Sequence, residues 1–362
     1  MIDCDVHNDW VNANVLLPYM EGTFRDYLKR GERVGGPESF PHGHRPWLHP
    51  EGYRRADLNP AEGHSAGSDY AMMKRELLDK YDLEYAILTG EEIIDISTIA
   101  NPYYASAMAR ANNEYTIHEW LSLDKRLKGS LSIAPQDPVG AAAEIRRRGD
   151  HPDIVQVMLS SAARRPYGDP FYHPIWEAAA EMGLPVAMHL GGNGGVNAES
   201  SFAMPPTFYY EHHALLCQSA MSHVASLILH GVFEKWPTLQ FVIIECGISW
   251  LPPVLWRLDS GWKALRKETP WLTRLPSEYA KDHIRFTTQP LEQPPVKEHL
   301  LAMLEAMDGK NTLLFSSDYP HWDFDDPFKV AIPEDWRENV FDLNIRKVYK
   351  KLPQKSEQLR TT

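Results

Sequence analysis

Cysteine is scarce in this sequence: only Cys4, Cys217 and Cys246 are present among 362 residues. Such a small and odd number excludes the dense disulfide framework of small secreted domains and favours a reducing compartment. The first apolar run begins at residue 2, which leaves no room for a signal peptide before it. We therefore expect a cytoplasmic protein with free thiols.

A long apolar run and an excess of positive charge are also missing. No uninterrupted apolar stretch approaches the roughly 20 residues that a membrane-spanning helix needs. The formal net charge is -12, which suits neither a nucleic-acid backbone nor an anionic membrane surface. The composition predicts instead a globular protein that binds small molecules or other protein chains.

What the sequence does contain is a regular alternation of short apolar runs and helical segments. Eight β-then-α units in a chain of this length predict a (β/α)8 TIM barrel, with a doubly wound open sheet as the alternative. Since no break in composition marks a second domain, we expect a single domain over residues 1–362. The predicted strands cover residues 2–6, 84–90, 127–135, 153–161, 184–190, 238–246, 283–290 and 311–318.

Residues 31–67 interrupt this pattern, because they lack apolar periodicity and are rich in glycine, proline, histidine and arginine. Loops longer than about 15 residues are commonly lids or binding loops. We therefore predict a lid inserted after the first strand. Arg45, or else Arg54 or Arg55, is expected to hold a substrate carboxylate, since a guanidinium group binds a carboxylate at two points.

Four of the predicted strands end in residues that commonly bind metals. Asp5 and His7 share one face at the end of the first strand, His189 ends the fifth, and Glu245 and Asp318 end the sixth and eighth. In a closed barrel these ends meet at one mouth. Imidazoles mixed with carboxylates suit Zn, Mn or Fe better than Mg or Ca. We predict a divalent metal centre there, with one metal or, given three carboxylates, two.

Several further side chains are expected near this centre. His321 lies three residues beyond Asp318, and His213 lies on a predicted helix over 209–234; either could complete a second metal site, and His321 could instead contact the substrate. The candidate catalytic residues are Asp318, His321 and Glu245. The candidate substrate contacts are Arg45, Trp47, Trp250 and Trp322.

The strand-end motifs resemble those of the amidohydrolase superfamily, in the branch of aminocarboxymuconate-semialdehyde decarboxylase and the hydroxybenzoate-type decarboxylases. The similar stretches are DCDVH, MHLGG, LILHGVFEKWPTLQFVIIECGISWLP and LLFSSDYPHWD, in that order along the chain. The resemblance implies a metal held by Asp5, His7, His189 and Asp318, with Asp318 also handling a proton. In two places the sequence departs from the family: Asp5 replaces a histidine, and Glu245 stands where a histidine is common.

Three hypotheses of function follow. The first is a metal-dependent hydrolase or non-oxidative decarboxylase acting on a small carboxylated or aromatic compound. The second is a dinuclear Fe or Mn/Fe oxygenase on the same barrel, with Glu245 as an additional carboxylate ligand. The third is a non-catalytic subunit that supports a related chain. In each case we expect a homo- or hetero-oligomer of amidohydrolase-like chains.

Overall fold

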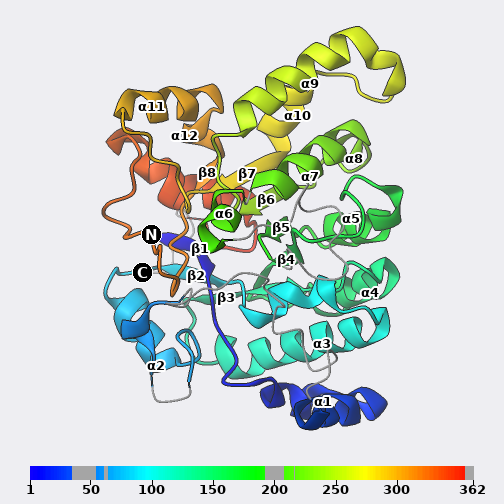
Figure 1. Cartoon of the computed structure of the whole chain (residues 1–362), viewed down its shortest axis with the longest axis vertical. Helices are drawn as coiled ribbons and strands as arrows, with labels where there is room; N and C mark the ends of the chain where they lie inside the picture. The colour runs from blue at the N-terminus through cyan, green and yellow to red at the C-terminus, as the bar shows by residue number, and fades with distance from the viewer. Residues whose placement is uncertain (35–53, 61–63, 192–207, 216, 355–362) are drawn as a thin grey trace.

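The barrel is built from eight parallel strands that pair in chain order. The computed structural model describes all residues except 35–53, 61–63, 192–207, 216 and 355–362. The helices follow the strands and lie outside them (Figure 1). The strands are β1 (Ile2–Val6), β2 (Tyr85–Leu88), β3 (Leu127–Ser132), β4 (Ile154–Ser160), β5 (Val186–His189), β6 (Phe241–Ile244), β7 (Ile284–Thr287) and β8 (Leu313–Leu314).

Hydrogen bonds between the first and last strands close the barrel. The Cys4 amide donates to the Phe315 carbonyl at 3.0 Å, and the His7 amide donates to the Tyr319 carbonyl at 2.8 Å. Val6 and Tyr319 form a parallel bridge at the same edge. This closure confirms the predicted (β/α)8 barrel and excludes the open sheet, and it brings the ends of β1 and β8 together.

The helices begin where the sequence supplies caps. The Asn101 side chain accepts hydrogen bonds from the amides of Tyr103 and Tyr104, and Asp137 caps the next helix in the same way. The helices are α1 (Gly22–Val34), α2 (Tyr70–Met73), α3 (Pro102–Tyr115), α4 (Pro138–Arg148), α5 (His173–Glu181), α6 (Tyr209–Ala214), α7 (Cys217–Leu229), α8 (Val232–Lys235), α9 (Leu251–Leu265), α10 (Pro276–His283), α11 (Lys297–Ala306), α12 (Gly309–Thr312) and α13 (Asn344–Val348).

Shorter helical segments lie between these elements. They are η1 (Ala13–Tyr19), η2 (Ala56–Leu58), η3 (Lys74–Asp79), η4 (Glu92–Thr98), η5 (Thr116–Leu121), η6 (Pro170–Tyr172), η7 (Arg266–Glu268), η8 (Glu334–Trp336) and η9 (Asn339–Leu343). Segments η3 and η5 continue α2 and α3 directly. Together they form continuous helical segments over 70–79 and 102–121.

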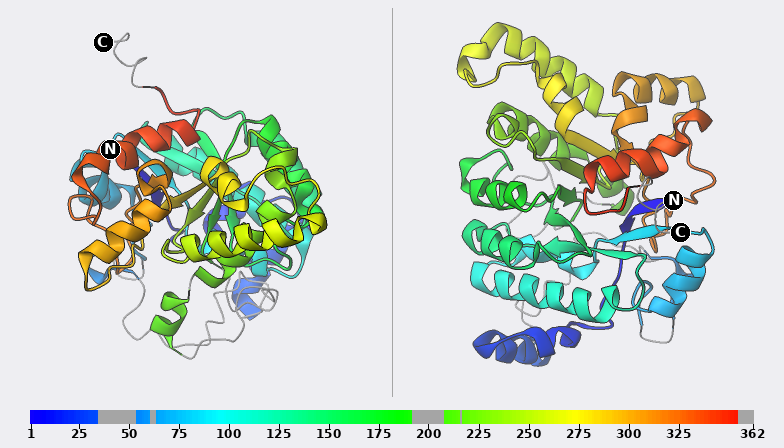
Figure 2. Two further views of the ribbon diagram at one scale, coloured as in Figure 1. Left: turned by 90° about the horizontal axis from the view of Figure 1, so that it is seen from above. Right: turned by 180° about the vertical axis from the view of Figure 1, so that it is seen from behind.

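The end of the barrel where the strands begin is filled by the C-terminal helix. Tyr349 and its neighbours on and after α13 join one buried apolar cluster with Ile2 and Cys4 of β1. The Tyr349 hydroxyl donates to Gln156 on β4 at 2.9 Å, and Gln156 donates to Ser130 on β3 at 2.7 Å. Figure 2 shows the C-terminal helix, in red, near the start of the chain. The side chains with chemical function lie at the opposite end, where the strands finish.

Seven of the eight strands, all except β1, are shorter than the sequence predicts. Two element boundaries differ for a clear physical reason. Residues 31–34 are the last turn of α1 and not the start of a loop, because Gly31 costs a helix only about 1 kcal/mol, too little to end it. The strand expected over 311–318 starts later, since α12 occupies Gly309–Thr312 and β8 is only Leu313–Leu314. The residues after Leu314 leave the strand direction and form hydrogen bonds with β1, for example between the Phe315 carbonyl and the Cys4 amide.

Two expectations from composition can be compared with the structure. Cys4, Cys217 and Cys246 are all free thiols, as predicted. Within the described part of the chain, we find no helix with both the length and the apolar character needed to cross a membrane.

Candidate metal centre

The predicted ligands converge at the mouth of the barrel. Two groups of donor atoms stand out among the described residues, and within each group the atoms lie within 4.8 Å of one another. All of these side chains are buried. The first group is Asp5, His7 and His189. The second group is His7, Glu245, Asp318 and His321.

The first group points its donor atoms at a common volume. His189 Nε2 lies 3.3 Å from Asp5 Oδ2, and His7 Nε2 lies 3.6 Å from Asp5 Oδ1. Each Nδ1 is 2.6 Å from a backbone carbonyl, that of Gly90 for His7 and that of Leu190 for His189. Because a carbonyl only accepts, each Nδ1 carries a proton and each Nε2 is left to face the centre.

Among the described residues, three buried atoms of the two donor groups lack a hydrogen-bond partner: Asp5 Oδ2, His189 Nε2 and Asp318 Oδ2. An unsatisfied buried polar atom costs on the order of 1–3 kcal/mol, so three of them in two groups that share His7 need an explanation. A divalent cation accepts electron pairs from two carboxylates and an imidazole at once. The donor set therefore fits a metal such as manganese, iron or zinc.

Backbone strain is concentrated at two of the candidate ligands. Glu245 and Asp318 have φ values of 56° and 59°, in the left-handed region that non-glycine residues rarely adopt. Such positions cost on the order of 1–3 kcal/mol and cluster at functional sites. The turn after Glu245 is held by Glu292, whose carboxylate accepts from the amides of Ile248 and Ser249.

Glu91 is a member of the site that the sequence analysis missed. Its Oε2 lies 3.1 Å from His7 Nδ1 and 3.0 Å from His321 Nε2. The other ring nitrogen of His321, Nδ1, lies 2.8 Å from Asp318 Oδ1. The sequence does contain a signal for Glu91. This residue follows the strand predicted over 84–90, so it lies at the same edge as the other strand-end residues.

The centre holds more negative charge than its own cations balance. Burial lowers the pKa of His7, but the Asp5 carboxylate and hydrogen bonds to Asp318 and Glu91 outweigh it and hold that pKa well above its ordinary value. Against the same effect of burial, Asp318 and Glu91 raise the pKa of His321 to about 10. Burial and the Asp318 charge raise the pKa of Glu245 well above its usual range. Protons on these groups partly neutralise the negative charge of the carboxylates. A bound cation would neutralise the same charge.

Arg54 brings a positive charge from the insertion to this site. Its Nη2 lies 2.7 Å from Asp9 Oδ2 and 3.7 Å from Glu91 Oε1. The backbone of Arg54 forms an antiparallel bridge with His321. The described end of the 31–67 insertion thus reaches the mouth of the barrel, whereas Arg45 lies outside the described residues. The predicted substrate contact Trp47 lies outside them too.

His213 has another partner in the structure. Its Nε2 lies 2.9 Å from Asp323 Oδ2, and Gln289 donates to the same oxygen at 2.8 Å. Neither group of candidate ligands includes His213. This pairing joins α6 to the loop after β8, so His213 has no place in the centre that we describe.

The two described tryptophans of the predicted pocket differ in exposure. Trp250 is only 6% exposed, and its Nε1 donates to the carbonyls of Cys246 and Gly247, which supports the turn after β6. Trp322 is 52% exposed and donates to the Tyr209 hydroxyl at 3.3 Å. Trp250 therefore has a structural role, whereas Trp322 is open to solvent.

His223, on α7, holds the loop after β4. Its Nδ1 accepts from the Tyr167 amide at 3.1 Å, and its Nε2 donates to the Ser161 carbonyl at 2.8 Å. Burial lowers its pKa from 6.5 to about 4. The folded protein therefore prefers the neutral ring, and the stability that it contributes is complete above pH 6.5 and lost as the pH falls towards 4.

We expect this shift to contribute about 3 kcal/mol to the free energy of unfolding at neutral pH. Urea unfolding of His223→Gln should show lower stability than the parent protein at pH 7.5, and the difference should shrink as the pH is lowered towards 4. The matched control is His118→Gln, at a histidine whose side chain is 58% exposed. A difference that stays constant with pH would contradict the assignment.

Comparisons with known proteins identify the family and the fold. The model of a family described as Amidohydrolase matches residues 2–351. Gamma-resorcylate decarboxylase of Rhodococcus jostii (strain RHA1) is 22% identical over 268 residues, which cover 70% of this chain and 78% of that protein.

Solved structures of decarboxylases share the fold. The 5-carboxyvanillate decarboxylase of Sphingomonas paucimobilis matches with a TM-score of 0.67 and 21% identity, over 97% of this chain and 99% of that chain. A dihydroxybenzoic acid decarboxylase of Polaromonas sp. JS666, solved with manganese and 2-nitroresorcinol, matches with a TM-score of 0.64 and 18% identity, over 97% of each chain. At these identities the likeness shows the fold alone.

Proposed function

The chain belongs to the amidohydrolase family, and from this premise we propose that it is a metal-dependent, non-oxidative decarboxylase of a small aromatic carboxylic acid. The observation that carries the proposal is the buried centre at the barrel mouth, where the two groups of donor atoms share His7. Within the described residues, Asp5, His189 and Asp318 each hold one buried atom there that makes no hydrogen bond. The decarboxylase names of the matched relatives support the same reaction class.

Asp5, His7, His189 and Asp318 would hold the metal. When bound, a divalent ion supplies positive charge that attracts a substrate carboxylate and stabilises negative charge as the carbon–carbon bond breaks. Because all four side chains are almost fully buried, water is largely excluded and these electrostatic interactions are strengthened.

Loss of carbon dioxide leaves an electron pair on the ring carbon, which must then take up a proton. His321 is placed to donate it, since each of its ring nitrogens faces a carboxylate oxygen and so carries a proton. Glu91 and Asp318 hold the imidazolium in position from its two sides. Arg54 adds a guanidinium group at the same edge, which can orient an anionic substrate.

Two measurements test this proposal directly. Elemental analysis of the purified chain should find about one manganese or zinc per chain. Under anaerobic conditions the metal-loaded protein should release carbon dioxide from 2,6-dihydroxybenzoate or 5-carboxyvanillate, and chelation should stop the reaction. A protein that turns over only with O2, or works equally well without metal, would contradict it.

The second candidate function is a dinuclear oxygenase. It is favoured by the second group of donors, because Glu245 and His321 add two possible ligands beyond the four that one ion needs. Two metals per chain including iron, together with O2-dependent turnover, would support this alternative. A non-catalytic supporting subunit is the third hypothesis, and turnover by the isolated chain would exclude it.

Assembly with like chains, the lid role of 31–67, the single-domain organisation and the cytoplasmic location all stay predictions. For assembly, α9 offers an apolar surface: Trp256 is 60% exposed and Leu265 is 58% exposed. Exposed side chains of this size are frequent at interfaces between subunits.

A further inference from the structure

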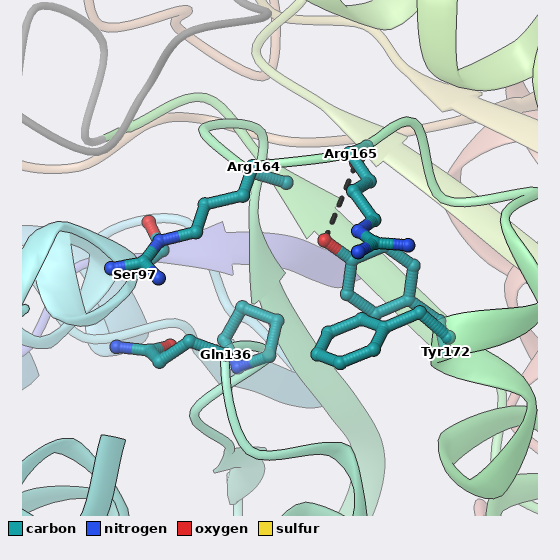
Figure 3. A pocket seen from close by; sticks show the side chains of 8 residues that line it. Ser97, Gln136, Arg164, Arg165 and Tyr172 are labelled. Atoms are coloured by element: carbon teal, nitrogen blue, oxygen red, sulfur yellow. Dashed lines mark hydrogen bonds between the residues drawn. The ribbon is translucent and has the colours of Figure 1, made fainter. Parts of the chain in front are cut away.

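A second cavity lies at the barrel mouth beyond the ends of β2, β3 and β4, and we propose that it binds a one-ring carboxylate that carries a hydroxyl group. Its volume is about 210 Å³. Neither group of candidate metal ligands contributes a residue to it, so the proposal does not rest on the proposed function. Its main lining residues are Ser97, Gln136, Arg164, Arg165, Phe171 and Tyr172 (Figure 3).

Two buried polar atoms of this cavity, Ser97 Oγ and Gln136 Oε1, have no hydrogen-bond partner in the described part of the chain. Ser97 is only 6% exposed. The Gln136 amide cannot be flipped, because its Nε2 donates to the carbonyls of Ile96 at 2.9 Å and Ile99 at 3.0 Å. No described residue donates to Gln136 Oε1, so a ligand hydroxyl can supply that hydrogen bond, while Ser97 can donate or accept.

Arginine side chains supply the positive charge. Figure 3 shows Arg164 reaching towards Ser97 from one side and Arg165 on the other side of the cavity. Arg165 Nη1 is 3.4 Å from Asp169 Oδ2, a long contact at a side chain that is 56% exposed, so it is a weak pair. A carboxylate that binds the Arg165 guanidinium group would make shorter, charge-assisted bonds.

Aromatic rings and size restrict the rest of the ligand. The ring centroids of Phe171 and Tyr172 are 5.1 Å apart, and the guanidinium carbon of Arg165 lies 5.1 Å from the Phe171 centroid. The two rings meet edge to face at 78°, and an aromatic lining favours a ligand with a ring of its own. Because pockets for drug-sized ligands span roughly 300–1,000 Å³, this smaller cavity suits a molecule with one ring.

Binding of 2-hydroxybenzoate to the full-length protein tests the inference. Equilibrium dialysis should find one equivalent that persists after the metal has been chelated. Arg165→Gln should weaken this equivalent by about tenfold or more, and Ser97→Ala should weaken it by a smaller factor. The matched control is Arg146→Gln, which removes another exposed arginine that pairs with Glu181 outside the cavity. It should leave binding unchanged.

The results separate this site from the metal centre. If no chelator-resistant equivalent binds, or if Arg165→Gln and Ser97→Ala both bind as tightly as the parent protein, the second site is refuted. If the chelator-resistant equivalent is present but the metal-loaded protein does not decarboxylate aromatic acids, the second site stands and the proposed function fails.

Discussion

Replacing His189 with alanine is expected to remove the bound metal and to lower turnover by about a thousandfold or more. His189 Nε2 is one of the unpartnered atoms that face the centre, while its Nδ1 is anchored on the Leu190 carbonyl. Loss of one of the four proposed ligands should weaken metal binding. Loss of the metal would then remove several kcal/mol of transition-state stabilisation, which corresponds to that factor. Metal content and initial rates should be measured on the same preparation.

The fold should survive this change, because the barrel is stabilised by its apolar clusters and His189 contributes one imidazole at the mouth. Near-ultraviolet circular dichroism checks this point. The control is His118→Ala, which removes an imidazole from an exposed site. Retention of stoichiometric metal with full turnover in His189→Ala would refute the ligand assignment.

Replacing Asp318 with asparagine should lower turnover to a similar extent while leaving part of the metal bound. Asp318 lies in the left-handed region, with φ 59°, which asparagine tolerates better than alanine does. Asp318→Asn therefore removes the charge without adding backbone strain. It also removes the carboxylate that faces His321 Nδ1 at 2.8 Å and so disturbs the proposed proton donor.

A matched control exists on the outside of the barrel. Asp308 has φ 57°, and its carboxylate pairs with Lys281 and accepts a hydrogen bond from Asn311. Asp308→Asn makes the same chemical change in the same backbone conformation, away from the candidate metal centre. Its turnover should equal that of the parent protein, and full turnover in Asp318→Asn would show that this carboxylate takes no part in the reaction.

Most of the barrel could be predicted because its strands are encoded locally. Each apolar run is short and lies between turn or helix signals, so its position follows from neighbouring residues. The first and last residues of the strands could not be predicted as well, since they depend on hydrogen bonds between distant segments. The short β8 illustrates this: the residues after Leu314 bond to β1, and a strand prediction cannot contain that contact.

The candidate site was predicted in part for the same reason. The carboxyl ends of the parallel strands all lie at one end of the barrel, so Asp5, His189 and Asp318 could be grouped from the sequence alone. Glu91 obeys the same rule but was overlooked, because a glutamate after a strand is ordinary when its contacts with two imidazoles are unseen.

The positions of the helices and strands, and the residue types at the barrel mouth, follow from the sequence alone, because periodicity and strand ends are local properties. The pairing of those side chains depends on tertiary contacts. The tertiary structure assigned His213 to Asp323, buried Trp250 beneath a turn and placed Glu91 between His7 and His321. Such choices depend on distances between residues far apart in the chain, which closure of the barrel sets and no local pattern encodes.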